Sequence, residues 1–346
     1  MKFRLKAIDL FCGAGGLSVG LGRSGFDVMA AVEVSETAAK TYKMNHSNCN
    51  IYNNDIKSLD PETIMSDLGI EKGELDLLAG CPPCQGFSTH KTRNRSSSVE
   101  DERNDLIFVF VEYIRRFLPK AIMLENVPGL AKDYRMFSVM KEISRLGYIL
   151  HENSLQIKNV ADYGVPQRRR RLILVASRLG VIEDPKKIKD KKTVRETISH
   201  MQPVGLSGDA LHDIPSNRSE RIQEIIEMIP KDGGSRKSLP KKYWLQCHIR
   251  RPDGYNDVYG RMKWDDVSPT ITSGCYNPSK GRFLHPEENR PISLREAALL
   301  QSFPSSYRFC MDRGKSDVAL MIGNALPPAF ISIHAEECYN HLISYL

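Results

Sequence analysis

Short apolar runs alternate with segments of helical periodicity over the first 180 residues of the chain. In the helical segments, such as 104–117, apolar residues recur three and four positions apart, and Ser35 suits the N-cap of a helix over 35–45. Five runs have the length of buried strands, and a weaker one leads into Asn54 and Asp55. The five are residues 6–11, 27–33, 75–79, 121–125 and 172–176. Because strands that alternate with helices build βαβ units, the pattern predicts an α/β fold, a doubly wound, mostly parallel sheet with helices on both faces.

The character of the sequence changes near residue 181. Residues 181–195 are rich in lysine, and from there to about residue 290 glycine, proline, serine and charged residues give repeated turn signals. We expect this segment to form a second, smaller, irregular domain. A helical pattern returns toward the C-terminus, where Pro327 and Pro328 suit the start of a helix.

Composition limits the class of protein without identifying it. The 346 residues are 41% hydrophobic and 26% charged, as in ordinary globular proteins, which excludes fibrous and disordered classes. No apolar run reaches the roughly 20 residues of a membrane span, and the N-terminal residues lack the apolar stretch of a secretory signal. The eight cysteines are scattered through a chain too large to need disulfides, so we expect a reducing, cytoplasmic location and no membrane partner. The net charge of +7 permits a nucleic-acid partner but does not require one.

A glycine-rich turn follows the first predicted strand and leads into a helix. Gly13, Gly15 and Gly16 allow the backbone to turn tightly and to approach a ligand. Glu33 ends the second strand, 20 residues after Gly13, where a carboxylate can accept hydrogen bonds from ribose hydroxyls. Asp55 lies a further 22 residues on, where it can receive an adenine amino group. This spacing favours an adenosine-containing cofactor over a plain turn with two solvated carboxylates, but it does not separate dinucleotides from S-adenosylmethionine.

Two cysteines, Cys81 and Cys84, follow the fourth predicted strand with two prolines between them. This spacing is half of a zinc site, but no second pair of cysteines or histidines with ligand spacing accompanies it. It also resembles a thioredoxin-type redox pair, although that smaller fold has no use for the upstream glycine turn. The third interpretation makes Cys84 a lone nucleophile at the carboxyl end of a strand, beside the cofactor crevice. We favour this interpretation and expect no metal.

A polar, basic segment, residues 88–103, follows the cysteines. Its composition cannot pack a core, and long segments of this kind are usually active-site loops or disorder. Basic and hydroxyl side chains in it could bind phosphates, although a run of charge is more often a solvated face.

An acid and four arginines complete the candidate chemistry. Glu125 ends an apolar strand, a position where burial raises the pKa of a carboxyl group and suits it to protonate or hydrogen-bond a heterocycle. The alternative is a strand-end glutamate paired with an arginine. Arginines occupy positions 168–171, directly before the last strand, and alternation places Arg169 and Arg171 on one face and the other two on the opposite face.

In their order along the chain, these segments resemble the DNA (cytosine-5)-methyltransferases of the minimal bacterial restriction–modification type. The resemblance covers nearly the whole chain, and it includes Arg103-Asn-Asp-Leu, Arg295-Glu-Ala-Ala-Leu-Leu-Gln-Ser-Phe-Pro and Gly323-Asn-Ala-Leu-Pro-Pro. Between residues 181 and 290 the family pattern is lost, as is usual for its variable target-recognition domain. The resemblance implies an S-adenosylmethionine-dependent, Rossmann-like catalytic domain formed by 1–180 with 323–346. Residues 181–322 would then form a smaller target-recognition domain and hinge.

The resemblance also implies the reaction and the roles of individual residues. A methyl group would pass from S-adenosylmethionine to carbon 5 of a specific cytosine in double-stranded DNA, leaving S-adenosylhomocysteine, through base flipping and a covalent Cys84 adduct. Glu125 would hold the cytosine N3 and amino group, and Arg169 and Arg171 would support the base and the loop. The cofactor site would be lined by Phe11, Gly13, Gly15, Gly16, Leu17, Glu33, Val34, Asp55, Ile56, Pro83, Leu106 and Asn324.

The expected partner is duplex DNA with a short recognition sequence, bound by a monomer, with a restriction endonuclease as a functional and not a physical partner. A tRNA cytosine methyltransferase, a catalytically silent DNA-binding protein that binds S-adenosylmethionine and a Rossmann dehydrogenase are the alternatives. The candidate DNA contacts are Ser88, Lys91, Arg93 and Arg95 in the basic segment, and Arg261 and Arg282 in the smaller domain, near Lys263, Trp264, Tyr276 and Lys280. The sequence does not indicate which bases are recognised.

Overall fold

The computed structural model describes residues 4–83, 105–215, 217–250, 254 and 256–346. Within these residues, seven strands form one sheet in the order β3-β2-β1-β4-β5-β7-β6. Neighbouring strands from β3 to β5 are parallel, whereas β7 runs antiparallel to both β5 and β6. The strands are β1 (Leu5–Leu10), β2 (Phe26–Val32), β3 (Asn50–Tyr52), β4 (Leu77–Gly80), β5 (Ala121–Asn126), β6 (Leu155–Asn159) and β7 (Arg170–Ser177). The prediction of a doubly wound, mostly parallel sheet is confirmed.

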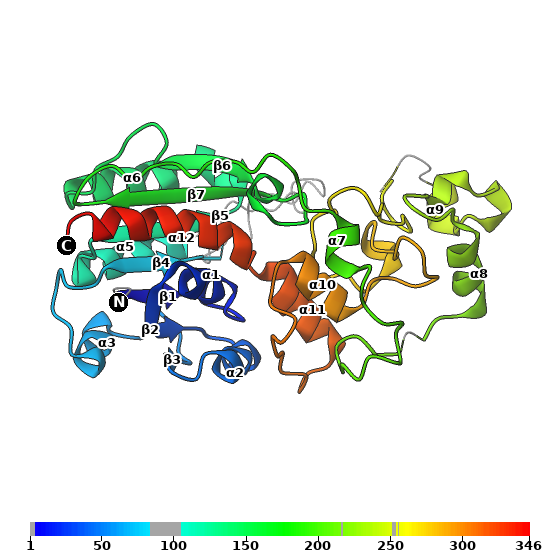
Figure 1. Ribbon diagram of the computed structural model, residues 1–346, viewed down its shortest axis with the longest axis horizontal. Helices are drawn as coiled ribbons and strands as arrows, with labels where there is room; N and C mark the ends of the chain where they lie inside the picture. The colour runs from blue at the N-terminus through cyan, green and yellow to red at the C-terminus, as the bar shows by residue number, and fades with distance from the viewer. Residues whose placement is uncertain (1–3, 84–104, 216, 251–253, 255) are drawn as a thin grey trace.

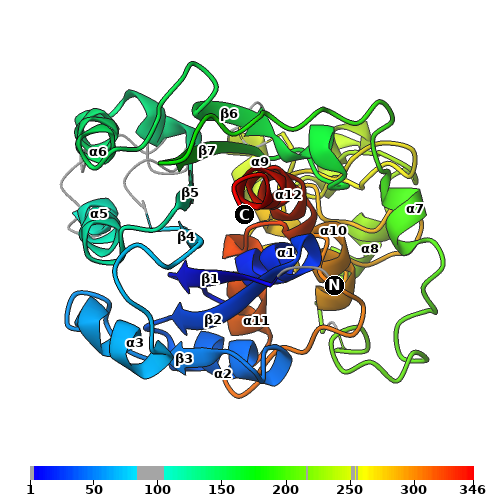
Figure 2. The ribbon, with the colours of Figure 1, turned by 60° about the vertical axis from the view of Figure 1, so that its left-hand side comes forward.

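Alternate residues of the central strands serve two separate hydrophobic cores. Ile8, Leu78 and Ile122 belong to the core beneath α3 (Pro61–Leu68), α5 (Leu106–Phe117) and α6 (Tyr134–Arg145). Their neighbours Leu77 and Ala121 belong to the core beneath α1 (Gly16–Ser24) and α12 (Pro328–Ile343). Figure 2 shows the sheet between these two layers of helices. Because both faces are covered, the central strands carry apolar residues on both sides, which is why they were visible as apolar runs.

The sequence analysis missed one strand. β6 lies at the edge of the sheet and is half-exposed along most of its length, so its sequence, Leu155-Gln-Ile-Lys-Asn159, has no apolar run. The helix predicted over 35–45 is α2 (Glu36–Asn45), and the Ser35 side chain accepts a hydrogen bond from the Ala38 N–H, as expected of an N-cap.

Residues 194–324, in the second half of the chain, form a smaller, mainly irregular body with short helices (Figure 1). One apolar cluster includes Phe283, Phe303 and Ile322, and it also takes in Ala14 and Ala38 from the first half of the chain. A smaller cluster surrounds Ile226 and Leu284. The helices are α7 (Val194–Ile198), α8 (Glu220–Met228), α9 (Gln246–Arg250), α10 (Leu294–Leu300) and α11 (Lys315–Asn324).

The C-terminal segment returns to the sheet and packs against α1. Gly20 makes this approach close, because a Cβ there would lie 2.5 Å from the Cβ of Ile331 in α12. Taken together, Lys315–Ile343 is long and apolar enough by composition to cross a membrane, which the sequence analysis did not anticipate. Its most apolar window is 67% buried inside the fold, however, which is typical of a core helix.

Candidate active site

A tight turn joins β1 to α1 at the carboxyl end of β1. Gly13 and Gly15 have positive φ angles of 53° and 92°, which glycine adopts without strain, and Phe11 has a φ angle of 62°, which is uncommon for a residue with a side chain. A Cβ on Gly15 would lie 2.5 Å from the hydroxyl of Tyr307, which itself donates a 2.5 Å hydrogen bond to the carbonyl oxygen of Ala14. A Cβ on Gly13, by contrast, would meet no atom within 4 Å. The turn is therefore packed on one side and open at Gly13.

Glu33 follows β2 and is fixed against this turn by backbone N–H groups. Gly13 N–H donates to Oε2 at 2.9 Å, and Ser35 N–H donates to Oε1 at 2.7 Å. Burial raises the pKa of Glu33, and these hydrogen bonds oppose the rise. Each carboxylate oxygen can still accept a second hydrogen bond, so the ribose-binding role predicted from the spacing is geometrically available.

The other predicted cofactor residues occupy positions around this turn. Leu17 is buried in the first turn of α1, and Ile56 is buried after β3. Asp55 is exposed, and its Oδ1 accepts the N–H of Lys57 at 3.0 Å. Val34 leaves 68% of its surface exposed, which is a large fraction for an apolar residue beside a candidate ligand site. The half-buried Pro83 and Leu106 and the exposed Asn324 complete the set.

The antiparallel direction of β7 brings its first residues to the carboxyl end of β5. There the Nε of Arg171 lies 2.7 Å from Oε1 of Glu125, and Glu125 is only 7% exposed. Arg169 is buried beside them and donates from Nη1 to the carbonyl oxygens of Ile271 and Gly323, both at 3.0 Å. The alternation predicted for these two arginines is confirmed.

Burial and the neighbouring charges shift the pKa of Glu125 in opposite directions. Burial raises the pKa of Glu125, as predicted, while Arg171 and then Arg169 lower it. Burial and the charge of Arg171 lower the pKa of Arg169, and Glu125 raises it. The cluster therefore holds a carboxyl group whose proton affinity is raised by its surroundings but limited by two guanidinium groups.

Cys81 lies against the same carboxyl group. Its thiol forms a hydrogen bond with Glu125, and burial followed by the charge of Glu125 raises its pKa well above the usual value. Cys81 is thus held as a neutral thiol, which does not suit an attacking thiolate. Nearby, Asn126 Nδ2 donates to the carbonyl oxygen of Pro82 at 2.9 Å and fixes the segment that leads to Cys84. Cys84 itself lies outside the described residues.

Two buried glutamines, which the sequence analysis left without a role, link three segments at this site. Gln167 accepts the N–H of Ile271 at 2.9 Å, and its Nε2 donates to Oε1 of Gln301 at 2.6 Å. Gln301 in turn donates from Nε2 to the carbonyl oxygen of Ile322 at 2.6 Å. Both glutamines are 0% exposed. Their amides form a continuous chain from residue 271 to the end of α11, directly beside Arg169.

The candidate DNA contacts of the smaller domain need correction. Arg261 is 0% exposed, and its guanidinium donates to the carbonyl oxygens of Ile226, Ile229, His285 and Glu288. The assignment of Arg261 as a DNA contact is therefore wrong. Arg282 donates to the carbonyl oxygens of Gly233, Gly234 and Arg261, and 26% of its side chain is exposed. Sequence cannot distinguish a buried arginine that binds backbone carbonyls from an exposed one. Ser88, Lys91, Arg93 and Arg95 lie outside the described residues.

The described part of the chain contains no group of three or more His, Cys, Asp or Glu side chains arranged to hold a metal ion.

Comparisons with known proteins place this arrangement in a family. The family described as C-5 cytosine-specific DNA methylase matches residues 5–340. The chain is 34% identical over 343 residues to the type II methylase M.HgiDII of Herpetosiphon aurantiacus, with 95% of this chain and 94% of that protein covered. It is 30% identical over 342 residues to the type II methyltransferase M1.HphI of Haemophilus parahaemolyticus, covering 96% of this chain and 86% of that protein.

The fold is similar to that of solved methyltransferases. A putative DNA modification methyltransferase encoded within an E. coli prophage superposes with a TM-score of 0.74 at 23% identity, over 98% of this chain and 99% of that one. A methyltransferase of Entamoeba histolytica gives a TM-score of 0.66 at 15% identity, over 98% and 99%. At these identities the two structures support the fold alone. The family match and the type II relatives support more: the chain belongs to the C-5 cytosine-specific DNA methylase family and is a DNA cytosine-5 methyltransferase of the type II restriction–modification kind.

Proposed function

We propose that the methyl donor is S-adenosylmethionine, bound at the glycine turn and released as S-adenosylhomocysteine. The open space at Gly13, the free lone pairs of Glu33 and the exposed surface of Val34 fit a nucleoside with a charged tail. Glu33 would accept the ribose hydroxyls, Val34 would pack against the adenine, and Asp55 would accept its amino group. When bound, the donor supplies a methyl group on a sulfonium sulfur.

The observation that carries the proposal is the buried pair of Glu125 and Arg171, fixed at 2.7 Å beside the segment that leads to Cys84. The thiolate of Cys84 would add to carbon 6 of cytosine while Glu125 donates a proton or hydrogen bond to N3, which makes carbon 5 electron-rich. Carbon 5 then takes the methyl group. Loss of the carbon 5 proton to a base, return of any N3 proton to Glu125 and departure of the Cys84 thiolate restore the aromatic ring.

Arg171 and Arg169 have distinct roles in this scheme. Arg171 aims the carboxyl group and limits the rise of its pKa, so Glu125 can both hold a proton and release it. Arg169 fixes the backbone of Ile271 and Gly323, and the second of these precedes the cofactor residue Asn324. Arg169 would therefore hold the carboxyl site and the cofactor site at a fixed distance from each other.

A cytosine stacked in a duplex cannot contact a carboxyl group that is only 7% exposed. The target base must therefore leave the duplex, at a cost of roughly a few kcal/mol. We propose that residues 181–322 recognise a short sequence in duplex DNA, and that residues 1–180 with 323–346 hold the cofactor and the flipped base. Ser88, Lys91, Arg93 and Arg95 would bind phosphates, and a monomer would act in the cytoplasm beside a separate restriction endonuclease.

Transfer of tritiated methyl groups from S-adenosylmethionine to duplex DNA tests this proposal. We expect Cys84→Ala to abolish transfer and Glu125→Gln to reduce it by at least a hundredfold, in line with the usual contribution of a general acid. Cys247→Ala, which removes an exposed cysteine in α9, is the matched control and should retain full activity. Full activity of Cys84→Ala would refute the mechanism, and transfer to tRNA but not to DNA would refute the substrate. Bisulfite sequencing of DNA from an expressing host then identifies the recognition sequence and the modified cytosine.

A further inference from the structure

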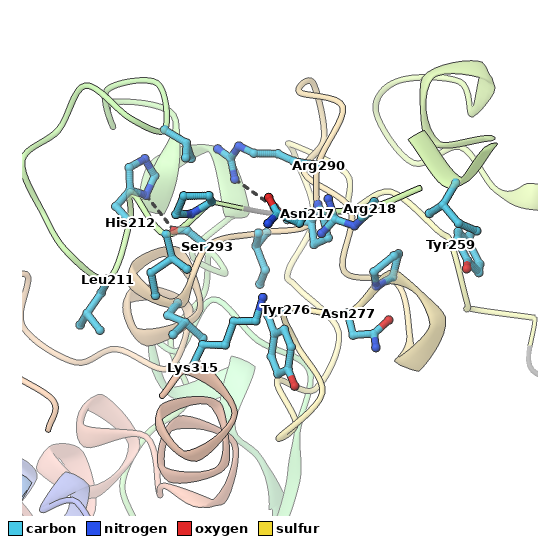
Figure 3. Close-up of a pocket in the computed structure, with 18 of the residues that line it drawn as sticks. Leu211, His212, Asn217, Arg218, Tyr259, Tyr276, Asn277, Arg290, Ser293 and Lys315 are labelled. Atoms are coloured by element: carbon cyan, nitrogen blue, oxygen red, sulfur yellow. Dashed lines mark hydrogen bonds between the residues drawn. The ribbon is translucent and has the colours of Figure 1, made fainter. Parts of the chain in front are cut away.

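The smaller body contains a cavity of about 360 Å³ that is separate from the cofactor and carboxyl sites. Figure 3 shows it between the segment that leads into α8, the turn at Tyr276 and Asn277, the strand-like segment before α10, and Lys315 at the start of α11. Every residue that lines it falls within 204–315, and none belongs to the proposed catalytic or cofactor residues. Its volume lies in the range of pockets that bind small organic ligands, about 300–1,000 Å³.

The charged side chains that line the cavity are all cations. Among the described residues, Arg290, Arg218 and Lys315 line it, and no aspartate or glutamate does. The charge of Arg290 is already balanced, because its guanidinium binds Glu288 and Glu296. The cavity therefore owes its unbalanced positive charge to Arg218 and Lys315.

Arg218 is the less solvated of the two. It is half-buried, and burial lowers its pKa. Within the described residues no carboxylate forms an ion pair with it. An arginine that loses solvent without gaining an acidic partner is stabilised when an anion binds beside it. Lys315 is exposed, and its ammonium lies 5.6 Å from the centre of the Tyr276 ring.

The remaining walls suit a flat, partly polar group. Tyr276 and the buried Tyr259 offer aromatic surface, and Ile222 and Ile292 offer apolar surface. Stacking on aromatic side chains binds bases of any sequence. Asn217 adds an exposed side-chain amide at the same cavity, which can pair with the edge of a heterocycle.

From this combination we propose that the cavity binds a nucleotide: the phosphate contacts Arg218 and Lys315, and the base packs between Tyr276 and the isoleucines. The phosphate can come from a free nucleotide or from a nucleotide within a nucleic-acid chain, and the chemistry of recognition is the same. This site differs from the one that holds the target cytosine, because Glu125 and the cofactor turn are not among its residues.

The test uses the full-length protein and three variants that each remove one positive charge. Arg218→Gln and Lys315→Gln alter the cavity, and Lys237→Gln, an exposed lysine of the same body that does not line it, is the matched control. Thermal melting checks that each variant is folded. Calorimetry then measures binding of inorganic phosphate and of the four deoxynucleoside 5′-monophosphates, and fluorescence anisotropy measures binding of duplex and single-stranded oligonucleotides over a range of salt concentrations.

Nucleoside monophosphate binding that weakens at least tenfold in Arg218→Gln and Lys315→Gln, but not in Lys237→Gln, supports a free nucleotide as the ligand. If monophosphates do not bind, the proposal requires a tenfold loss of oligonucleotide affinity in the two cavity variants relative to Lys237→Gln. The salt slope of that affinity must also fall by about 1. Binding by the cavity variants that matches Lys237→Gln for every probe overturns the proposal. Methyl transfer is assayed separately, so failure of the proposed function appears as an inactive wild-type protein, whatever the cavity binds.

Discussion

Replacement of Gln301 by leucine tests the buried chain of amides that joins three segments of the molecule. Leucine has a similar size, but it removes the acceptor of the Gln167 Nε2–H and the donor to two carbonyl oxygens, those of Ile322 and Ala325. The side chain is 0% exposed, so water cannot replace these bonds without rearrangement.

The size of the effect follows from the groups left behind. The carbonyl oxygen of Ile322 loses a 2.6 Å bond, and Nε2 of Gln167 keeps only a 3.4 Å contact with the carbonyl oxygen of Leu300. A buried polar group without a partner costs about 1–3 kcal/mol. With two such groups, we expect the free energy of unfolding to fall by about 2–5 kcal/mol. The carbonyl oxygen of Ala325 is only partly buried and adds little.

Urea denaturation measures this change, and the two tryptophans of the chain simplify the assay. Both Trp244 and Trp264 lie in the second half, so their fluorescence reports the unfolding of the smaller body, while circular dichroism reports all helices. The control is Gln156→Leu, which removes a side-chain amide of β6 that donates to Asn153. It should change the free energy of unfolding by about 0.5 kcal/mol or less. A midpoint for Gln301→Leu that equals the midpoint for Gln156→Leu would refute the structural role of the amide chain.

A second variant separates the donor from the acceptor. Gln301→Glu keeps an acceptor for Gln167, but an ionised carboxylate cannot donate to Ile322 and carries a buried charge. A protonated carboxyl group can donate. Gln301→Glu should therefore be less stable than Gln301→Leu near neutral pH and should regain stability as the pH falls. If the free energy of unfolding depends on pH equally in both variants, the hydrogen bond that Gln301 donates to Ile322 does not contribute to stability.

Three shorter predictions test other parts of the structure. Burial raises the pKa of Asp9 from 3.8 to about 7. Its protonated form therefore stabilises the fold by about 4 kcal/mol at most; this contribution is complete below about pH 4 and is lost as the pH rises through 7. Asp9→Asn, which cannot ionise, should lose less stability than wild type in urea titrations between about pH 5 and about pH 9. Gly20→Ala should destabilise by about 1–3 kcal/mol, because its Cβ would meet Ile331 at 2.5 Å, whereas Gly22→Ala, with nothing within 4 Å, should be neutral or slightly stabilising in thermal melts. Arg171→Leu removes the main group that lowers the Glu125 pKa against burial, so methyl transfer should fall at least tenfold and its pH profile should move to higher pH; an unshifted profile would contradict that role.

The sequence predicted the elements whose physical signal is local. The central strands were visible because both of their faces are buried, and Arg169 and Arg171 could be assigned to one face because side chains alternate along a strand. The raised pKa of Glu125 followed from its place at the end of an apolar strand. In each case, a short stretch of sequence contained the information.

The features that the sequence analysis missed depend on contacts between distant segments. Arg261 was taken for a DNA contact, but the carbonyl oxygens that bury it belong to residues 24–35 positions away. Gln167 and Gln301 are 134 residues apart, and nothing local marks either as buried. β6 was missed for a different reason: an edge strand needs no apolar run.

The contacts that join the smaller body to the proposed site end mainly on backbone atoms. Tyr307 donates to the carbonyl oxygen of Ala14 in the glycine turn, and Arg169 and Gln167 both bind the backbone of Ile271. Substitution of Ala14 or Ile271 changes a side chain but leaves the bonded atoms in place. These contacts therefore depend on the path of the bonded backbone, while the Gln167–Gln301 bond, the Arg168–Asp266 ion pair and the apolar cluster around Ala14 add side-chain contacts to the joint. A body attached in this way can change its surface, and with it the DNA sequence that it would recognise, while Glu125, Arg171 and the cofactor turn keep their positions.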